Sequence, residues 1–67
     1  MTIAKTDVNG RIVSSNLKMD TIGSIMPEKL CYETWIENLS SSPWAVCYSF
    51  AEAKNKHAQA ILLAEQL

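Results

Sequence analysis

Apolar and polar residues alternate loosely along the first seventeen positions, and a turn signal divides that stretch in two. Thr2–Val8 and Arg11–Leu17 both carry β-branched residues at alternating positions, which is typical of strands. Between them stand Asn9 and Gly10, which tolerate the positive φ angles of a two-residue type I′ turn. The pattern predicts a first β-hairpin over residues 2–17.

The next stretch, residues 18–29, follows neither the strand period nor the helix period. Gly23 and Pro27 interrupt it. We interpret it as a connector whose apolar residues cover one edge of the core, namely Ile22, Ile25 and Met26.

Residues 30–48 predict a second hairpin. Leu30–Glu37 is rich in β-formers, and the strand period places its residues on two faces. One face carries Leu30, Tyr32, Thr34 and Ile36, and the other carries Cys31, Glu33, Trp35 and Glu37. A turn-forming segment, NLSSSP, leads to a second predicted strand, Trp44–Tyr48, with Trp44, Val46 and Tyr48 on one face.

The closing residues have a helical period. Ser49 and Glu52 fit a capping box, in which each side chain bonds the backbone amide of the other residue. No proline or glycine follows, so a helix is predicted over residues 50–66. Its apolar stripe spans roughly 120° at the helical period and consists of Phe50, Ala53, His57, Ala60, Ile61, Ala64 and Leu67.

Together these elements predict an α+β fold: two β-hairpins in a small antiparallel sheet, packed by one C-terminal α-helix. With 67 residues the chain is expected to form a single domain, 1–67. A domain of this size buries only about 60% of its unfolded surface, so a partner or a second copy would add useful burial.

Charge and hydropathy narrow the classes of protein to which the chain could belong. Six basic residues stand against seven acidic ones, which argues against a strongly basic nucleic-acid-binding face. The longest apolar runs, residues 44–48 and 60–64, are far shorter than a membrane-spanning helix. The first residues lack the layout of a signal peptide. We expect a soluble protein in the bacterial cytoplasm, with no membrane contact.

The sequence offers little catalytic or metal-binding chemistry. A Ser–His–Asp arrangement would need one of the scattered serines (Ser14, Ser15 or Ser40–Ser42) with Asp7 or Asp20, and no nucleophile motif supports it. Cys47 and His57 flank one predicted strand–helix junction, but Cys31 and Cys47 are expected to be buried thiols. Metal-ligand spacing is lacking. We expect no enzyme, no metal and no cofactor.

His57 is the single histidine, and it lies at the centre of the apolar helix stripe. We expect it to pack against the sheet, with Tyr32, Tyr48 or a strand backbone group as its hydrogen-bond partner. A histidine that contacts a partner or senses pH is the alternative.

Four residues are the candidate contact residues for a partner: Trp35, Trp44, Leu62 and Leu63. The aromatic residues of the second hairpin point to both sheet faces, so one set is expected to be exposed or in an interface. Leu62 falls opposite the helix stripe and Leu63 borders it, which favours self-association through the C-terminal half of the helix, as in a homodimer.

The residues from Tyr32 to His57 resemble a class of very small phage-encoded proteins. The resemblance covers Y-E-T at Tyr32–Thr34, an aromatic strand ending at Tyr48, and E-A-x-x-x-H from Glu52 to His57. It implies an accessory protein of a phage or mobile element, and it brings no activity and no catalytic residues.

These observations favour a small non-enzymatic protein-interaction module. The expected version is a phage factor that binds and inhibits a host complex, as anti-CRISPR proteins do. Two alternatives remain open. One is a single-stranded nucleic-acid binder that stacks bases on Tyr32, Trp35 or Trp44. The other is a structural component of a phage assembly.

Overall fold

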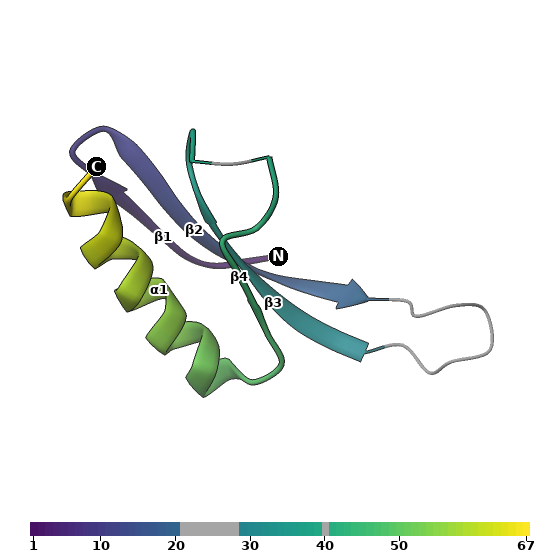
Figure 1. Cartoon of the computed structure of the whole chain (residues 1–67). Coiled ribbons are helices and arrows are strands. Elements are labelled where there is room, and N and C mark those ends of the chain that lie inside the picture. Colours follow the sequence, from purple (N-terminus) through teal and green to yellow (C-terminus); the bar gives the residue numbers. More distant parts are fainter. Residues whose placement is uncertain (21–28, 40) are drawn as a thin grey trace.

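A computed structural model describes residues 1–20, 29–39 and 41–67 of the chain. Four strands form one antiparallel sheet in the order β1-β2-β3-β4, and a helix follows (Figure 1). The elements are β1 (Thr2–Val8), β2 (Arg11–Asp20), β3 (Lys29–Ile36), β4 (Ala45–Cys47) and α1 (Phe50–Glu65). The predicted α+β class, with two hairpins packed by a C-terminal helix, is confirmed.

The first hairpin turns at the predicted residues. Asn9 and Gly10 have φ angles of 54° and 87°, and Val8 stands opposite Arg11. Asp7 strengthens the turn, because its Oδ1 accepts a hydrogen bond from the Gly10 amide at 2.7 Å. Thus five neighbouring residues, 7–11, set the turn between β1 and β2.

β2 is longer than the sequence pattern predicts, and β3 has the predicted length but begins and ends one residue earlier. β2 continues to Asp20 and β3 begins at Lys29, so residues 18–20 and 29 of the predicted connector belong to the sheet. β2 and β3 pair along eight residues, and this pairing extends β2 beyond the residues that alternate in polarity. The predicted edge residues Ile22, Ile25 and Met26 lie outside the described residues.

β4 is shorter than predicted, and the predicted shared face of Trp44, Val46 and Tyr48 is not formed. Trp44 precedes the strand and packs against the core, whereas Val46 and Tyr48 are exposed. The Trp44 amide donates to the Thr34 carbonyl at 2.8 Å. Since Trp44 stands before the regular ladder, the alternation of the strand does not extend to it.

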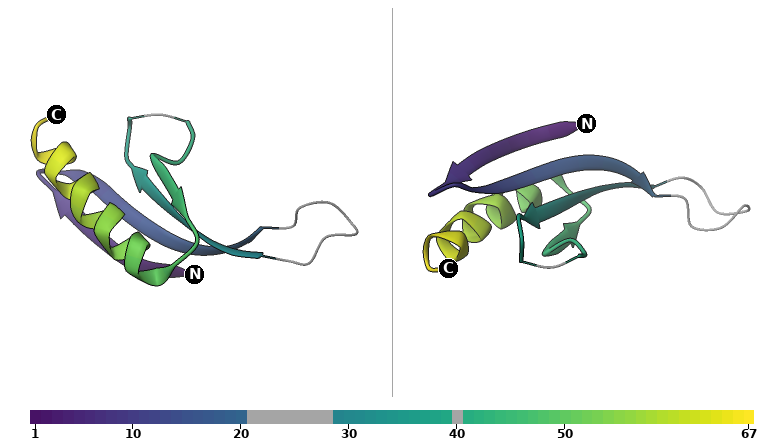
Figure 2. Two further views of the ribbon diagram at one scale, coloured as in Figure 1. Left: turned by 60° about the horizontal axis from the view of Figure 1, so that its bottom comes forward. Right: turned by 90° about the horizontal axis from the view of Figure 1, so that it is seen from above.

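α1 lies along one face of the sheet, and no described helix or strand covers the opposite face (Figure 2). Ser49 caps the helix, since its Oγ accepts from the Glu52 amide at 3.1 Å. This confirms the Ser49 half of the capping box. No helix in the described part of the chain is long and apolar enough to cross a membrane.

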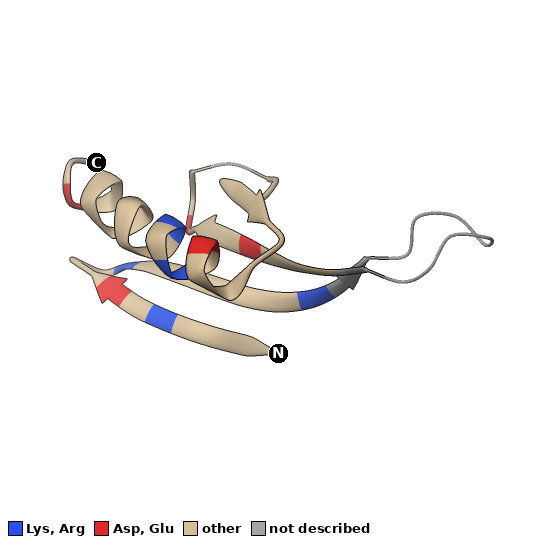
Figure 3. Ribbon diagram, turned by 90° about the horizontal axis from the view of Figure 1, so that it is seen from below, with Lys and Arg blue, Asp and Glu red and all other residues tan. Residues whose placement is uncertain are grey.

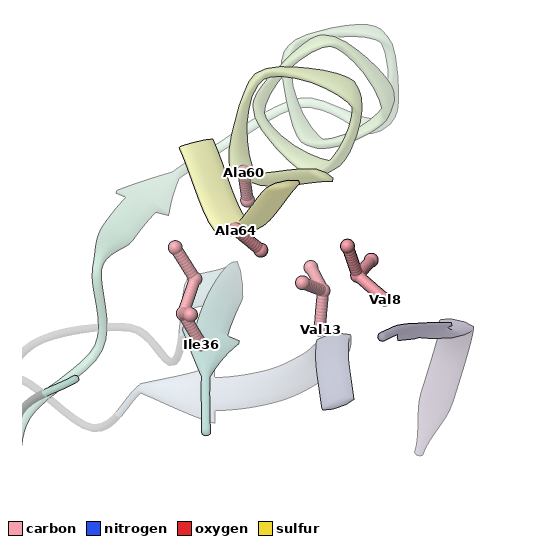
Figure 4. Packing of buried hydrophobic residues seen from close by; sticks show 5 residues of the cluster. All are labelled: Val8, Val13, Ile36, Ala60 and Ala64. Atoms are coloured by element: carbon pink, nitrogen blue, oxygen red, sulfur yellow. The ribbon is translucent and has the colours of Figure 1, made fainter. Parts of the chain in front are cut away.

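The hydrophobic core sits between the C-terminal half of α1 and the first three strands. Its buried members are Val8, Val13, Ile36, Ala60 and Ala64 (Figure 4). The helix contributes alanines, whose small side chains let its backbone approach the valines and the isoleucine of the sheet. Trp44, Ile61 and Leu63 are partly buried around this cluster.

Two residues of the predicted helix stripe are exposed. Phe50, the first helical residue, turns its ring toward Tyr32 in an edge-on contact with centroids 6.2 Å apart. Leu67 lies beyond the last helical residue, Glu65, where the 100° spacing no longer applies. The stripe is therefore buried at Ala53, His57, Ala60 and Ala64.

Candidate functional site

His57 stands at the centre of a hydrogen-bonded cluster between the helix and the sheet. Its Nδ1 lies 2.8 Å from Ser15 Oγ, and its Nε2 lies 3.0 Å from Thr6 Oγ1. Ser15 Oγ in turn lies 3.0 Å from Thr34 Oγ1. We call these four residues, one each from β1, β2, β3 and α1, the polar cluster.

The sheet register brings the three hydroxyl groups together. Ser15 stands directly opposite Thr34 on β3 and directly opposite Ala4 on β1, two residues from Thr6. Residues that face each other across a ladder project from the same side of the sheet. That side is the one under α1, and both Ser15 and Thr34 are fully buried there.

Burial favours the neutral form of His57. Removal from water disfavours the charged imidazolium, so it lowers the pKa of His57 below its ordinary value of 6.5. A neutral imidazole donates from one ring nitrogen and accepts at the other. Hydroxyl groups can fill either role, and no buried polar side-chain atom in the described residues lacks a partner.

The predicted packing of His57 against the sheet is confirmed, but its predicted partners were wrong. The ring bonds to the hydroxyls of Ser15 and Thr6, and neither Tyr32 nor Tyr48 takes that place. The signal was present in the strand alternation, because Thr6 and Ser15 fall on the same sides of their strands as the core valines. Recognising it requires knowing which sheet face the helix covers.

The Ser15–His57 contact has the atoms of a nucleophile–base pair, but Ser15 is not accessible as a nucleophile must be. Ser15 is fully buried, with Thr34 on one side and His57 on the other. A substrate carbonyl therefore has no path to Ser15 Oγ in this fold. The arrangement joins the helix to the sheet.

Cys31 and Cys47 are buried thiols that no disulfide joins, as predicted. Burial raises the pKa of the Cys47 thiol, and the nearby Glu52 carboxylate raises it further. Cys47 Sγ makes weak contacts with the carbonyls of Tyr32 and Ser49, at 3.9 and 4.0 Å. A protonated, buried thiol is a poor nucleophile.

The four predicted contact residues occupy three different places. Trp44 and Leu63 are half-buried and pack against the core. Trp35 is half-buried, and its indole Nε1 donates to Glu33 Oε1 at 3.3 Å. Leu62 is 61% exposed on α1. Because Trp35 projects from the sheet face away from α1, Trp35 and Leu62 do not share one surface.

Three exposed apolar residues stand where β4 leads into α1. Val46, Tyr48 and Phe50 follow one another at every second position and are 48%, 53% and 54% exposed. The intervening Cys47 is buried. We call Val46, Tyr48 and Phe50 the junction patch. Val46 stands opposite Glu33 in the ladder, whereas the Phe50 ring contacts Tyr32, which projects from the other face of β3, so the three residues lie around the β4 edge of the sheet and not on one face. The sequence pattern had grouped Val46 and Tyr48 with Trp44, and Phe50 with the helix stripe.

Charged groups beside the junction patch are few and of both signs. Lys54 Nζ lies 5.8 Å from the centre of the Phe50 ring, within the range of a cation–π contact. Elsewhere the exposed Lys18 forms an ion pair at 3.6 Å with Glu33, whose side chain is partly buried. In the described residues, basic and acidic positions are distributed over the strands and the helix, and no element is uniformly basic (Figure 3).

Small-molecule and metal sites are poorly developed in the described part of the chain. One hollow of about 180 Å³ lies between the β1–β2 turn, the end of β3 and the end of α1, with Arg11 and Glu37 on its wall. Ligand pockets commonly enclose about 300 Å³ or more. No three His, Cys, Asp or Glu side chains among the described residues are grouped to hold a metal ion.

No family model matches the chain, and no curated protein or solved structure matches it either.

Proposed function

We propose that the protein is an interaction module that binds another protein through the junction patch and thereby changes the activity of that protein. The exposure of Val46, Tyr48 and Phe50 at consecutive alternate positions carries the proposal. Large apolar side chains exposed at neighbouring positions of a small domain are candidates for an interaction site. Aromatic anchors such as Tyr48 and Phe50 supply much of the binding energy in protein interfaces.

The rest of the molecule suits this role. The polar cluster and the alanine-rich core hold α1 on the sheet, so the junction between β4 and α1 has a defined shape. A preformed surface loses less conformational entropy on binding than a surface that must first become ordered. Leu62 and the outer side of Trp35 remain candidates for secondary contacts.

The biological form of the proposal is a phage accessory factor that inhibits a host complex, in the manner of an anti-CRISPR protein. Its support is the resemblance of residues 32–57 to very small phage-encoded proteins, together with the junction patch.

Affinity capture with a matched pair of variants tests the binding proposal. The immobilised protein and its Tyr48→Ser/Phe50→Ser variant are each exposed to lysate of a candidate bacterial host, and the recovered proteins are compared by mass spectrometry. We expect a protein that the original recovers and the variant loses. A second variant, Asn55→Ser/Gln59→Ser, changes exposed helix residues outside the patch and should recover it. Identical recovery by all three proteins would reject the proposal.

Single-stranded nucleic acid is the second candidate partner, because Lys54 stands beside the exposed Phe50 ring. Aromatic rings stack on bases, and a neighbouring cation binds the phosphate backbone. Tryptophan and tyrosine fluorescence should then fall when an oligonucleotide is added at low salt, and the effect should weaken steeply as salt increases. Unchanged fluorescence at low salt would remove this candidate.

A further inference from the structure

We propose that two copies of this chain associate through the open edge of β1, with Thr6 on the two-fold axis and Lys5 of each copy opposite Asp7 of the other. This surface is separate from the junction patch, so the proposal goes beyond the proposed function. It places the two sheets side by side as one continuous sheet.

β1 is an edge strand. Among the described residues it pairs with β2 alone, and β2 separates it from β3 (Figures 1 and 2). A register shift between Thr2 and Ala4 interrupts its regular ladder near the start. The regular part of the edge is therefore residues 4–8. An unpaired edge is a template for another strand, and bulges shorten it.

The hydrogen-bonding direction of each residue follows from the neighbouring ladder. The Ile12 carbonyl accepts from the Glu37 amide at 2.9 Å, so the backbone of Ile12 faces away from β1. In an antiparallel ladder this direction alternates, and Arg11 and Val13 face β1. Their opposite residues, Val8 and Thr6, accordingly face β2.

Lys5 and Asp7 are the residues left with backbone groups that point outward. In an antiparallel pair, such outward residues must stand opposite each other to exchange their hydrogen bonds. A two-fold axis through Thr6 places Lys5 opposite Asp7 of the second copy, and Asp7 opposite its Lys5. Each of these pairs closes one hydrogen-bonded ring.

Charge selects this register over its neighbours. β1 carries one basic and one acidic residue, Lys5 and Asp7, both exposed (Figure 3). With the axis at Thr6, opposite charges meet twice. With the axis at Lys5, two lysines meet, and with the axis at Asp7, two carboxylates meet. Opposite charges across a strand pair stabilise it, and like charges destabilise it.

The same register matches the apolar side of the edge. It places Ala4 of one copy opposite Val8 of the other, on the face that α1 covers. Thr6 is the midpoint of residues 4–8, so all five regular residues are used. Asp7 Oδ1 already accepts from Gly10 in its own turn, but a carboxylate has a second oxygen for Lys5 of the other copy.

Charge exchange tests the proposal. Self-association is measured by analytical ultracentrifugation up to about 1 mM protein, the range of weak complexes, for the original chain, Lys5→Glu, Asp7→Lys and the double variant. Each single change sets like charges together and should weaken the dimer about tenfold or more. The double change restores opposite charges, so its dimer should be tighter than that of Asp7→Lys. Both of these variants lack the hydrogen bond from the Gly10 amide to Asp7, so the comparison isolates the effect of charge. Circular dichroism confirms that each variant is folded.

Two control variants separate pairing of the β1 edges from a general charge effect and from association through α1. Lys54→Glu makes the same change in net charge on α1 and should leave the dimer intact. Leu62→Glu tests association through the helix and should also leave it intact. The proposal is overturned if the original chain is monomeric throughout, or if Lys5→Glu dimerises as the original does. Loss of the dimer on Leu62→Glu with retention on Lys5→Glu would also overturn it.

Discussion

His57 on the helix and Ser15 on the second strand are 42 residues apart in the sequence, and their side chains meet at 2.8 Å beneath the helix. This contact, with Thr6 at the other ring nitrogen, replaces part of the apolar packing that a small domain would otherwise use. Hydrogen bonds depend on direction more strongly than apolar contacts do. The polar cluster therefore fixes where α1 lies on the sheet and hence the position of the junction patch.

Replacing Ser15 with alanine is expected to destabilise the fold. The substitution removes a partner from His57 Nδ1 and from Thr34 Oγ1, and both groups stay buried. An unsatisfied buried polar group costs about 1–3 kcal/mol. Urea unfolding of the Ser15→Ala variant measures the change. Ser14→Ala is the matched control, because Ser14 projects from the other face, and it should change the stability much less.

Stability should depend on pH through His57. Because the pKa of His57 is lowered in the fold, the unfolded chain takes up the proton first as the pH falls. The free energy of unfolding should therefore decrease as the pH drops below 6.5, by at most about 1.4 kcal/mol per unit. The decrease ends once the pH has passed the pKa of the folded state.

Chemical denaturation between pH 7.5 and 5 measures this dependence in the original chain and in His57→Gln. Other groups titrate in both proteins, so the difference between the two curves isolates the histidine. Equal pH dependence of the two proteins would contradict a buried, neutral His57.

The close approach of the helix depends on its alanines. Ala60 is fully buried against the sheet, so Ala60→Leu forces the helix outward. Overpacking of this kind costs about 1–3 kcal/mol. Ala51→Leu adds the same side chain at an exposed helix position and should be close to neutral. Thermal unfolding of both variants compares the two positions.

The β1–β2 turn requires glycine for its backbone conformation. Gly10 has a φ of 87°, and a Cβ added there would meet no atom within 4 Å. Gly10→Ala should therefore destabilise the fold through backbone strain alone, by roughly 1–2 kcal/mol. Asn9→Gly removes the Cβ at the neighbouring positive φ and should not show this loss. Equal stability of Gly10→Ala and the original would contradict the strained turn.

The features predicted correctly from the sequence depend on neighbouring residues. The Asn9-Gly10 turn and the Ser49 cap each involve residues within three positions, so their residue types suffice. The length of β2 depends on pairing with a distant strand, and the sequence pattern ended it too early. The partners of His57 likewise lie on strands far away in the sequence.

The environments of the candidate contact residues also depend on distant parts of the chain. Hydropathy alone did not separate Trp44, which packs against the core, from Tyr48, which is exposed. Their environments differ because β4 has only three residues and both Trp44 and Tyr48 lie outside it. Leu62 was placed correctly as exposed, since the helix period is regular there.

Site-specific photo-crosslinking tests most directly whether the junction patch is the binding surface. A photoreactive phenylalanine analogue is introduced in place of Phe50, and in a second protein in place of Asn55, which is also exposed on α1. After irradiation in cells of a candidate host, the protein labelled at position 50 should be joined to one specific partner protein, and the protein labelled at position 55 should not. Crosslinks to a partner from position 55 and none from position 50 would contradict the proposed function.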